Sequence, residues 1–129
     1  MTKVLLVASI DFHIIAFHLP YIEMLNSMGC TVDIAARITD INQSVPGAAN
    51  QFDIPFERSP YKSGNIKAYQ KIKHIIDKNK YNIIHCHTPV ASILTRFAAR
   101  NIRKNGAKVI YTAHGFHFFK GAPLINWII

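Results

Sequence analysis

The sequence predicts an α/β fold in which helices cover both faces of a parallel sheet, and two observations support it. Short apolar runs of strand length alternate with segments of about 10–15 residues whose apolar side chains recur at helical spacing. Some of the runs are apolar at every position, as Val4–Val7 is, which is typical of strands buried on both faces of a parallel sheet. The 129 residues are enough for one such Rossmann-like domain with one core.

The first half of the chain begins with a strand and a helix. Apolar positions recur at helical spacing over 14–28, and Gly29 is suited to end that helix. Pro20 is tolerated only in a first turn, so we expect regular helix to begin near His18 and residues 11–16 to form a loop. The other elements expected here are strands at 3–9, 31–36 and 52–56 and a loop at 40–50.

The second half continues the alternation with two helices and two strands. Asn65 is suited to cap a helix that ends near Lys78, with an inner face of Ile66, Tyr69, Ile72 and Ile76. Pro89 is suited to begin a helix that ends near Lys104, with an inner face of Val90, Leu94, Phe97 and Ala98. Strands are expected at 82–86 and 108–113.

Histidines follow the ends of two predicted strands. His85 and His87 lie on either side of Cys86, so both imidazoles share one face of their strand. His114 follows the next strand. Parallel strands end at the edge of the sheet where open α/β folds bind ligands, so we expect His87 and His114 to be functional. For His85 a hydrogen bond within the fold is the simpler interpretation.

The turn after the first strand, which contains Asp11 and His13, excludes the common nucleotide-binding loops. No glycine precedes Gly29, so neither the dinucleotide-binding Gly-x-Gly-x-x-Gly nor a P-loop is present there. Local capping or solvent contact is the alternative interpretation of His13 and His18. The spacing of the histidines and cysteines matches no zinc motif, so we expect no metal site.

Charge is unevenly divided along the chain. Residues 1–57 carry two basic and six acidic side chains, whereas residues 58–129 carry thirteen basic side chains and one acidic one, Asp77. A basic surface of this kind favours phosphates, nucleic acid or anionic lipid, and solvated helix faces are the alternative. Two cysteines without paired spacing, Cys30 and Cys86, argue against a disulfide framework and for a reducing cytoplasm.

Two motifs of the second half, taken together, resemble those of a known family. They are Ile83-Ile84-His85-Cys86-His87-Thr88-Pro89 and Thr112-Ala113-His114-Gly115-Phe116. With the His-Leu-Pro helix start after the first strand, they make the whole chain resemble the N-terminal domain of bacterial family-four glycosyltransferases. These enzymes have the GT-B architecture, and the resemblance is to the capsule and exopolysaccharide type.

The resemblance implies that residues 1–129 form the acceptor-side half of a two-domain enzyme. The C-terminal domain would bind the nucleotide-sugar donor, and residues 123–129, which resemble the start of an apolar helix, suggest a chain truncated before that domain. The full-length protein would be a retaining, hexosyl-type glycosyltransferase acting on a glycan or lipid-linked acceptor, without a cofactor. The fragment alone would be inactive. Open alternatives are a basic phosphate- or nucleic-acid-binding module without catalysis and a scaffold domain that works by interaction.

The resemblance also implies roles for individual residues. His114 would be catalytic and contact the transferring sugar at the cleft between the domains. Substrate would be bound by Asp11, His13, His87, Thr88, Gly115 and Phe116. A lipid-linked acceptor would place the protein in the cytoplasm, peripheral at the inner face of the cell membrane, and no nucleic-acid partner is expected. The side chains facing anionic headgroups would be Lys62, Lys67, Lys71 and Lys73.

Overall fold

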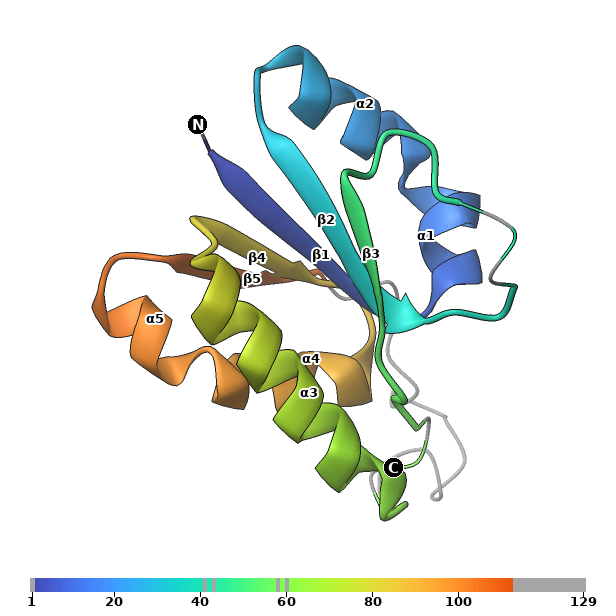
Figure 1. Cartoon of the computed structure of the whole chain (residues 1–129), viewed down its shortest axis with the longest axis vertical. Helices are drawn as coiled ribbons and strands as arrows, with labels where there is room; N and C mark the ends of the chain where they lie inside the picture. The colour runs from blue at the N-terminus through green and yellow to red at the C-terminus, as the bar shows by residue number, and fades with distance from the viewer. Residues whose placement is uncertain (1, 41, 43, 58, 60, 113–129) are drawn as a thin grey trace, which may run out of the picture.

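The computed structural model describes residues 2–40, 42, 44–57, 59 and 61–112 (Figure 1). In this part of the chain, strands form one sheet in the order β3-β2-β1-β4-β5, and every neighbouring pair is parallel. The prediction of a Rossmann-like α/β domain is therefore confirmed. The strands are β1 (Lys3–Ile10), β2 (Thr31–Arg37), β3 (Asn50–Asp53), β4 (Ile83–Cys86) and β5 (Lys108–Tyr111).

Helices cover the two faces of the sheet in two groups (Figure 1). One face carries α1 (Asp11–Phe17) and α2 (Leu19–Ser27), which follow β1. The opposite face carries α3 (Gly64–Asn79), α4 (Pro89–Ala98) and α5 (Arg100–Lys104). The sheet is thus the middle layer of three, as the apolar runs of the sequence require.

The alternation of side chains along β1 divides the core into two clusters. Leu5 and Val7 are fully buried on the side of the sheet that α3 and α4 cover. The residues between and beside them are fully buried on the side of α1 and α2; they are Val4, Leu6 and Ala8. The same alternation continues in β4, where Cys86 belongs to the α3 side. Burial on both faces explains why these strands are apolar at consecutive positions.

The strand order reverses beside β1. The chain passes from β1 to β2 and β3 on one side, then crosses through α3 to β4 on the other side of β1. The carboxyl ends of β1 and β4 therefore flank the switch point, which is where open parallel sheets bind ligands.

Residues 11–16 are helical, contrary to the predicted loop. Asp11 begins α1, and its carboxylate accepts hydrogen bonds from the backbone nitrogen and hydroxyl of Thr39 at 3.3 and 2.8 Å. Ile14 is fully buried against the sheet. Contacts distant in sequence, and a carboxylate in the first turn, stabilise a helix too short to form alone. The predicted restart is confirmed, because α2 begins at Leu19 with Pro20 in its first turn.

Two other boundaries differ from the prediction. A strand was expected over 52–56, but β3 ends at Asp53 because Pro55 has no N–H to give to a ladder. The helix expected over 89–104 is divided at Ala99, whose ψ of 4° departs from helical geometry. Ala99 is fully buried, so the chain turns where a small side chain meets the core.

Two apolar side chains expected on inner helix faces are exposed instead. Ile66 of α3 is 65% exposed and Phe97 of α4 is 59% exposed. Phe97 packs beside Tyr69 at the outer junction of the two helices, with ring centroids 5.6 Å apart. The face of α3 that is buried consists of Asn65, Ala68, Ile72, Ile75 and Ile76.

Candidate functional site

Side chains join the carboxyl ends of β1 and β4. Thr88 lies two residues after β4, and its Oγ1 accepts two hydrogen bonds from Ser9. The backbone nitrogen of Ser9 donates at 2.8 Å and the Ser9 hydroxyl at 2.7 Å. The backbone nitrogen of His87 donates to the carbonyl of Val7 at 2.9 Å. The two strand ends are held in fixed relative positions at the switch point.

Four histidine rings gather at this junction, and we call His13, His18, His85 and His87 the histidine cluster. His13 comes from α1, His18 from the joint between α1 and α2, and the other two from the end of β4. The ring centroids are 3.9 Å apart for His18 and His87, 4.1 Å for His85 and His87, and 5.1 Å for His13 and His18. His18, His85 and His87 are buried.

The chemistry of the histidine cluster suits a polar ligand. The planes of the first two ring pairs are inclined by 33° and 34°, so these imidazoles lie against one another in a tilted arrangement. Within the described ranges, no three His, Cys, Asp or Glu side chains are placed to hold a metal ion. Imidazole nitrogens donate or accept hydrogen bonds and exchange protons near neutral pH, which suits hydroxyl and phosphate oxygens.

His85 is held at both ring nitrogens, which confirms its interpretation as a hydrogen-bonded residue. Nδ1 lies 3.3 Å from the hydroxyl of Tyr21, and Nε2 lies 2.6 Å from Oγ1 of Thr112. Burial, followed by the nearby Cys30, raises the pKa of Tyr21 above its ordinary value. Its phenol therefore remains protonated as a hydrogen-bonding partner.

The structure brings together only part of the predicted substrate site. His13 and His87 belong to the histidine cluster, and Thr88 bridges the two strand ends. Asp11 is buried with its carboxylate on Thr39. The predicted residues His114, Gly115 and Phe116, like the predicted apolar helix start at 123–129, lie outside the described residues.

For His18 the sequence left local capping or solvent contact as an alternative, and its burial excludes solvent contact. His18, Ile22 and Leu25 recur at helical spacing, and all three are buried. His18 therefore lies on the same buried face as Ile22 and Leu25, with its imidazole beside that of His87.

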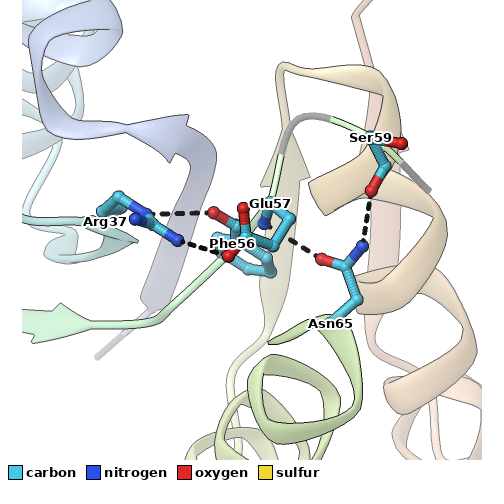
Figure 2. A network of polar contacts seen from close by, with 5 residues as sticks. All are labelled: Arg37, Phe56, Glu57, Ser59 and Asn65. Carbon is cyan, nitrogen blue, oxygen red and sulfur yellow. Dashed lines mark hydrogen bonds and ion pairs between the residues drawn. The ribbon is translucent and has the colours of Figure 1, made fainter. Parts of the chain in front are cut away.

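A second polar network orders the edge of the sheet beside β2 and β3 (Figure 2). Arg37 pairs with the Glu57 carboxylate at 3.1 Å and donates through Nε to the Phe56 carbonyl at 3.1 Å. Asn65 accepts from the backbone nitrogen of Glu57 at 3.0 Å and donates to the carbonyl of Ser59 at 2.9 Å. The prediction that Asn65 caps α3 is therefore wrong, because its side chain fixes the preceding loop instead.

The lysines predicted to face a membrane lie on α3 and just before it. Lys62, Lys67 and Lys71 are exposed. Lys73 is only partly exposed, and its Nζ pairs with the Asp77 carboxylate at 2.7 Å. Three of the four positive charges are thus directed to solvent.

Two further features lie away from the histidine cluster. Burial raises the pKa of the Cys86 thiol to about 12, so it remains protonated on the α3 side of the sheet. An open hollow of about 550 Å³ lies at the opposite, amino-terminal edge, beside Tyr81, Asn82 and Lys108. Because ligands of parallel sheets bind at the carboxyl edge, we assign the site to the histidine cluster.

Fold and site define an α/β domain with a histidine-rich carboxyl edge at the switch point of a parallel sheet. The sequence matches the family model described as glycosyl transferase 4-like over residues 3–129, and the chain belongs to this family. It is 46% identical over 127 residues to EpsD of Bacillus subtilis strain 168, whose name describes it as a glycosyltransferase. The match covers 98% of this chain but 32% of EpsD, so the chain spans about a third of that relative. The resemblance to family-four glycosyltransferases is confirmed.

Two solved structures share the fold. MurG of Acinetobacter baumannii matches with a TM-score of 0.63 at 15% identity, over 94% of this chain and 38% of MurG. The C-terminal domain of a hydrogenase from Pyrococcus furiosus matches with a TM-score of 0.58 at 13% identity, over 88% of this chain and 92% of that domain. A hydrogenase domain has this fold too, so function must be argued from family and site. The comparisons give no support to a nucleic-acid-binding module.

Proposed function

We propose that the whole protein containing this chain is a retaining GT-B glycosyltransferase. It transfers a sugar, of hexosyl type, from a nucleotide-sugar to a glycan or lipid-linked acceptor in the synthesis of a cell-surface polysaccharide. The observation that carries the proposal is the family match over residues 3–129. This chain supplies the acceptor-side domain, and a second domain supplies most of the donor site.

On this proposal the sugar site of this chain lies beside the histidine cluster. His13, His87 and Thr88 lie at the carboxyl edge, and the predicted His114, Gly115 and Phe116 complete the site. Glycosyl transfer develops positive charge on the sugar ring and negative charge on the departing phosphate. Imidazoles positioned before the reaction stabilise such charge without reorganisation. Asp11 acts indirectly, because its hydrogen bonds with Thr39 fix the position of α1 and therefore of His13.

The outer surface of α3 and α4 supports contact with an anionic membrane at the cytoplasmic face. Exposed Ile66 and Phe97 can enter a headgroup region. Arg100 lies 4.3 Å above the Phe97 ring and donates to the Tyr69 hydroxyl at 2.9 Å. Further positive charge comes from Lys62, Lys67 and Lys71. No helix in the described part of the chain is long and apolar enough to cross a bilayer.

The test is an assay of the purified whole protein with nucleotide-sugars labelled in the sugar, membranes of a polysaccharide-producing host, and NMR of the product. We expect transfer with retained anomeric configuration, the same rate with and without EDTA, and no transfer by residues 1–129 alone. An inverted product would contradict the retaining mechanism. Loss of transfer on chelation would contradict metal independence. Transfer by the isolated fragment would contradict the division between two domains.

A further inference from the structure

We propose that His85 is a positioning residue that sets the geometry of two strand ends at once. This inference rests on the proposed function, because those strand ends carry His87 and lead to the predicted catalytic His114. His85 is itself buried, with 9% of its surface exposed. Both of its ring nitrogens already have hydroxyl partners within the fold, so it acts through its neighbours rather than on a substrate.

Hydroxyl groups from two other elements hold the His85 ring. Tyr21 of α2 lies 3.3 Å from Nδ1, and its ring meets the imidazole edge-on at 77° with centroids 5.3 Å apart. Thr112, directly after β5, lies 2.6 Å from Nε2. One imidazole therefore links α2, β4 and the end of β5.

Hydroxyl partners suit this link because each of them can donate or accept a hydrogen bond. A neutral imidazole donates from one nitrogen and accepts at the other, whereas an imidazolium donates from both. The hydroxyls of Tyr21 and Thr112 satisfy either tautomer and the charged form. A carboxylate accepts only and an ammonium donates only, so neither would keep the link in every form of His85.

The link reaches the site by two routes. The backbone nitrogen of Thr112 donates to the carbonyl of Cys86 at 3.0 Å, so Thr112 is fixed by its backbone as well as by its side chain. Thr112 is therefore held in a fixed position directly after β5. The His85 ring also lies against that of His87, with centroids 4.1 Å apart, and the His87 ring lies against that of His18 at 3.9 Å. A displaced His85 ring would move both strand ends, and misplacement by about 1 Å can cost about a hundredfold in rate.

The first test is Thr112→Val in the whole protein, which removes the hydroxyl and keeps the size of the side chain. We expect turnover to fall about tenfold. This loss is smaller than the roughly hundredfold loss that a misplacement of about 1 Å can cause. The KM for the nucleotide-sugar, which is bound mainly by the other domain, should not change, whereas the unfolding midpoint should fall because the buried Nε2 of His85 loses its partner. Thr112→Ser keeps the hydroxyl and should keep the turnover. Wild-type turnover in Thr112→Val, or an equal loss in Thr112→Ser, would overturn the inference.

Coupling between the two residues gives a second test. His85→Phe keeps an aromatic ring but removes both hydrogen bonds. If His85 acts through Thr112, the double variant His85→Phe/Thr112→Val should be no slower than His85→Phe alone. Losses that multiply in the double variant would show that the two residues act separately.

A readout without catalysis distinguishes failure of this inference from failure of the proposed function. In protein labelled with ¹⁵N-histidine, Thr112→Val and Tyr21→Phe should each shift the imidazole resonances of His85 and His87. The resonances of His74, exposed on α3, should not move. Coupled shifts in a protein that transfers no sugar would leave the link standing and overturn the function. Unchanged shifts in an active enzyme would overturn the link alone.

Discussion

The phenol of Tyr81 donates a hydrogen bond of 2.6 Å to the buried carboxylate of Asp33, 48 positions earlier in the chain. The other carboxylate oxygen accepts from Nδ2 of Asn50 at 3.1 Å. Burial, with a smaller contribution from Asp33, raises the pKa of Tyr81, so the phenol stays a donor at any ordinary pH. These bonds are needed because Asp33 is only 1% exposed, and a buried carboxylate without donors is costly.

Tyr81→Phe should therefore destabilise the domain by about 1–3 kcal/mol, the cost of leaving a buried acceptor without its partner. Urea unfolding followed by circular dichroism measures the change. Tyr61→Phe is the matched control, because Tyr61 is 80% exposed and its loss of a hydroxyl should change stability by less than about 0.5 kcal/mol. Equal unfolding midpoints for the two variants would contradict the structural role of Tyr81.

Thr88→Val removes the acceptor that joins Ser9 to the end of β4. Two partly buried hydrogen bonds are lost, so we expect a destabilisation of about 1–3 kcal/mol. Thr88→Ser keeps the oxygen and should retain most of the stability. A Ser variant as unstable as the Val variant would show that the methyl group, rather than the bridge to Ser9, is what matters.

His114→Ala in the whole protein should lower turnover about a hundredfold or more, the usual scale for one polar group that stabilises developing charge. His74→Ala is the control, because His74 is an exposed histidine on α3. Initial rates with a labelled nucleotide-sugar give the comparison. If both variants turn over at the wild-type rate, His114 has no part in the reaction.

Membrane binding should depend on the exposed surface of α3. Replacing Lys62, Lys67 and Lys71 with Gln should release the protein from vesicles rich in anionic lipid, because each lysine contributes on the order of 1 kcal/mol near such a surface. The double variant Lys73→Gln/Asp77→Asn should have little effect, since it removes a pair whose charges already cancel. Sedimentation at increasing salt measures the attachment, which should weaken as the charges are screened.

The control for this surface changes charge elsewhere on the molecule. Lys80→Gln/Lys108→Gln alters the amino-terminal edge of the sheet and should leave vesicle binding unchanged. Ile66→Ser/Phe97→Ser keeps every charge and should weaken binding through lost apolar insertion. Equal recovery of the wild-type protein with neutral and anionic vesicles would contradict the membrane proposal.

Cys86 should resist alkylation in the folded protein. Its thiol is fully buried with a pKa of about 12, so little thiolate exists at pH 8. Iodoacetamide followed by mass spectrometry should modify Cys86 only in denaturant, and Cys30, which is partly exposed, in the folded protein as well. The raised pKa favours the folded state fully below pH 9, and this contribution is lost as pH rises towards 12. Rapid modification of native Cys86 would contradict its burial.

The layers of the fold could be predicted because buried parallel strands and amphipathic helices leave different periods in the sequence. The shared face of His85 and His87 follows from the two-residue period of a strand. The helix at Asp11 could not be predicted, because Thr39 and the packing of Ile14 stabilise it and both contacts are distant in sequence. Local propensity does not report such tertiary contacts.

The candidate site was predictable in part for the same reason. Strand ends locate His87 and Thr88, but the ring of His18 joins them only because α2 packs over β1 and β2. The exposure of Ile66 and Phe97 depends on how α3 and α4 are rotated about their own axes. The spacing of the apolar residues defines this rotation only to within about one residue.

The central place of β1 has a consequence for synthesis. β1 can pair with β2 as soon as residue 37 has formed, but its other edge is completed by β4, whose contacts with it span 79 positions. A nascent chain therefore exposes an unpaired edge of a largely apolar strand until residue 86 has left the ribosome. Such edges pair readily with other chains. We expect slow, non-local closure of the sheet to limit folding and to make the early chain a substrate for chaperones.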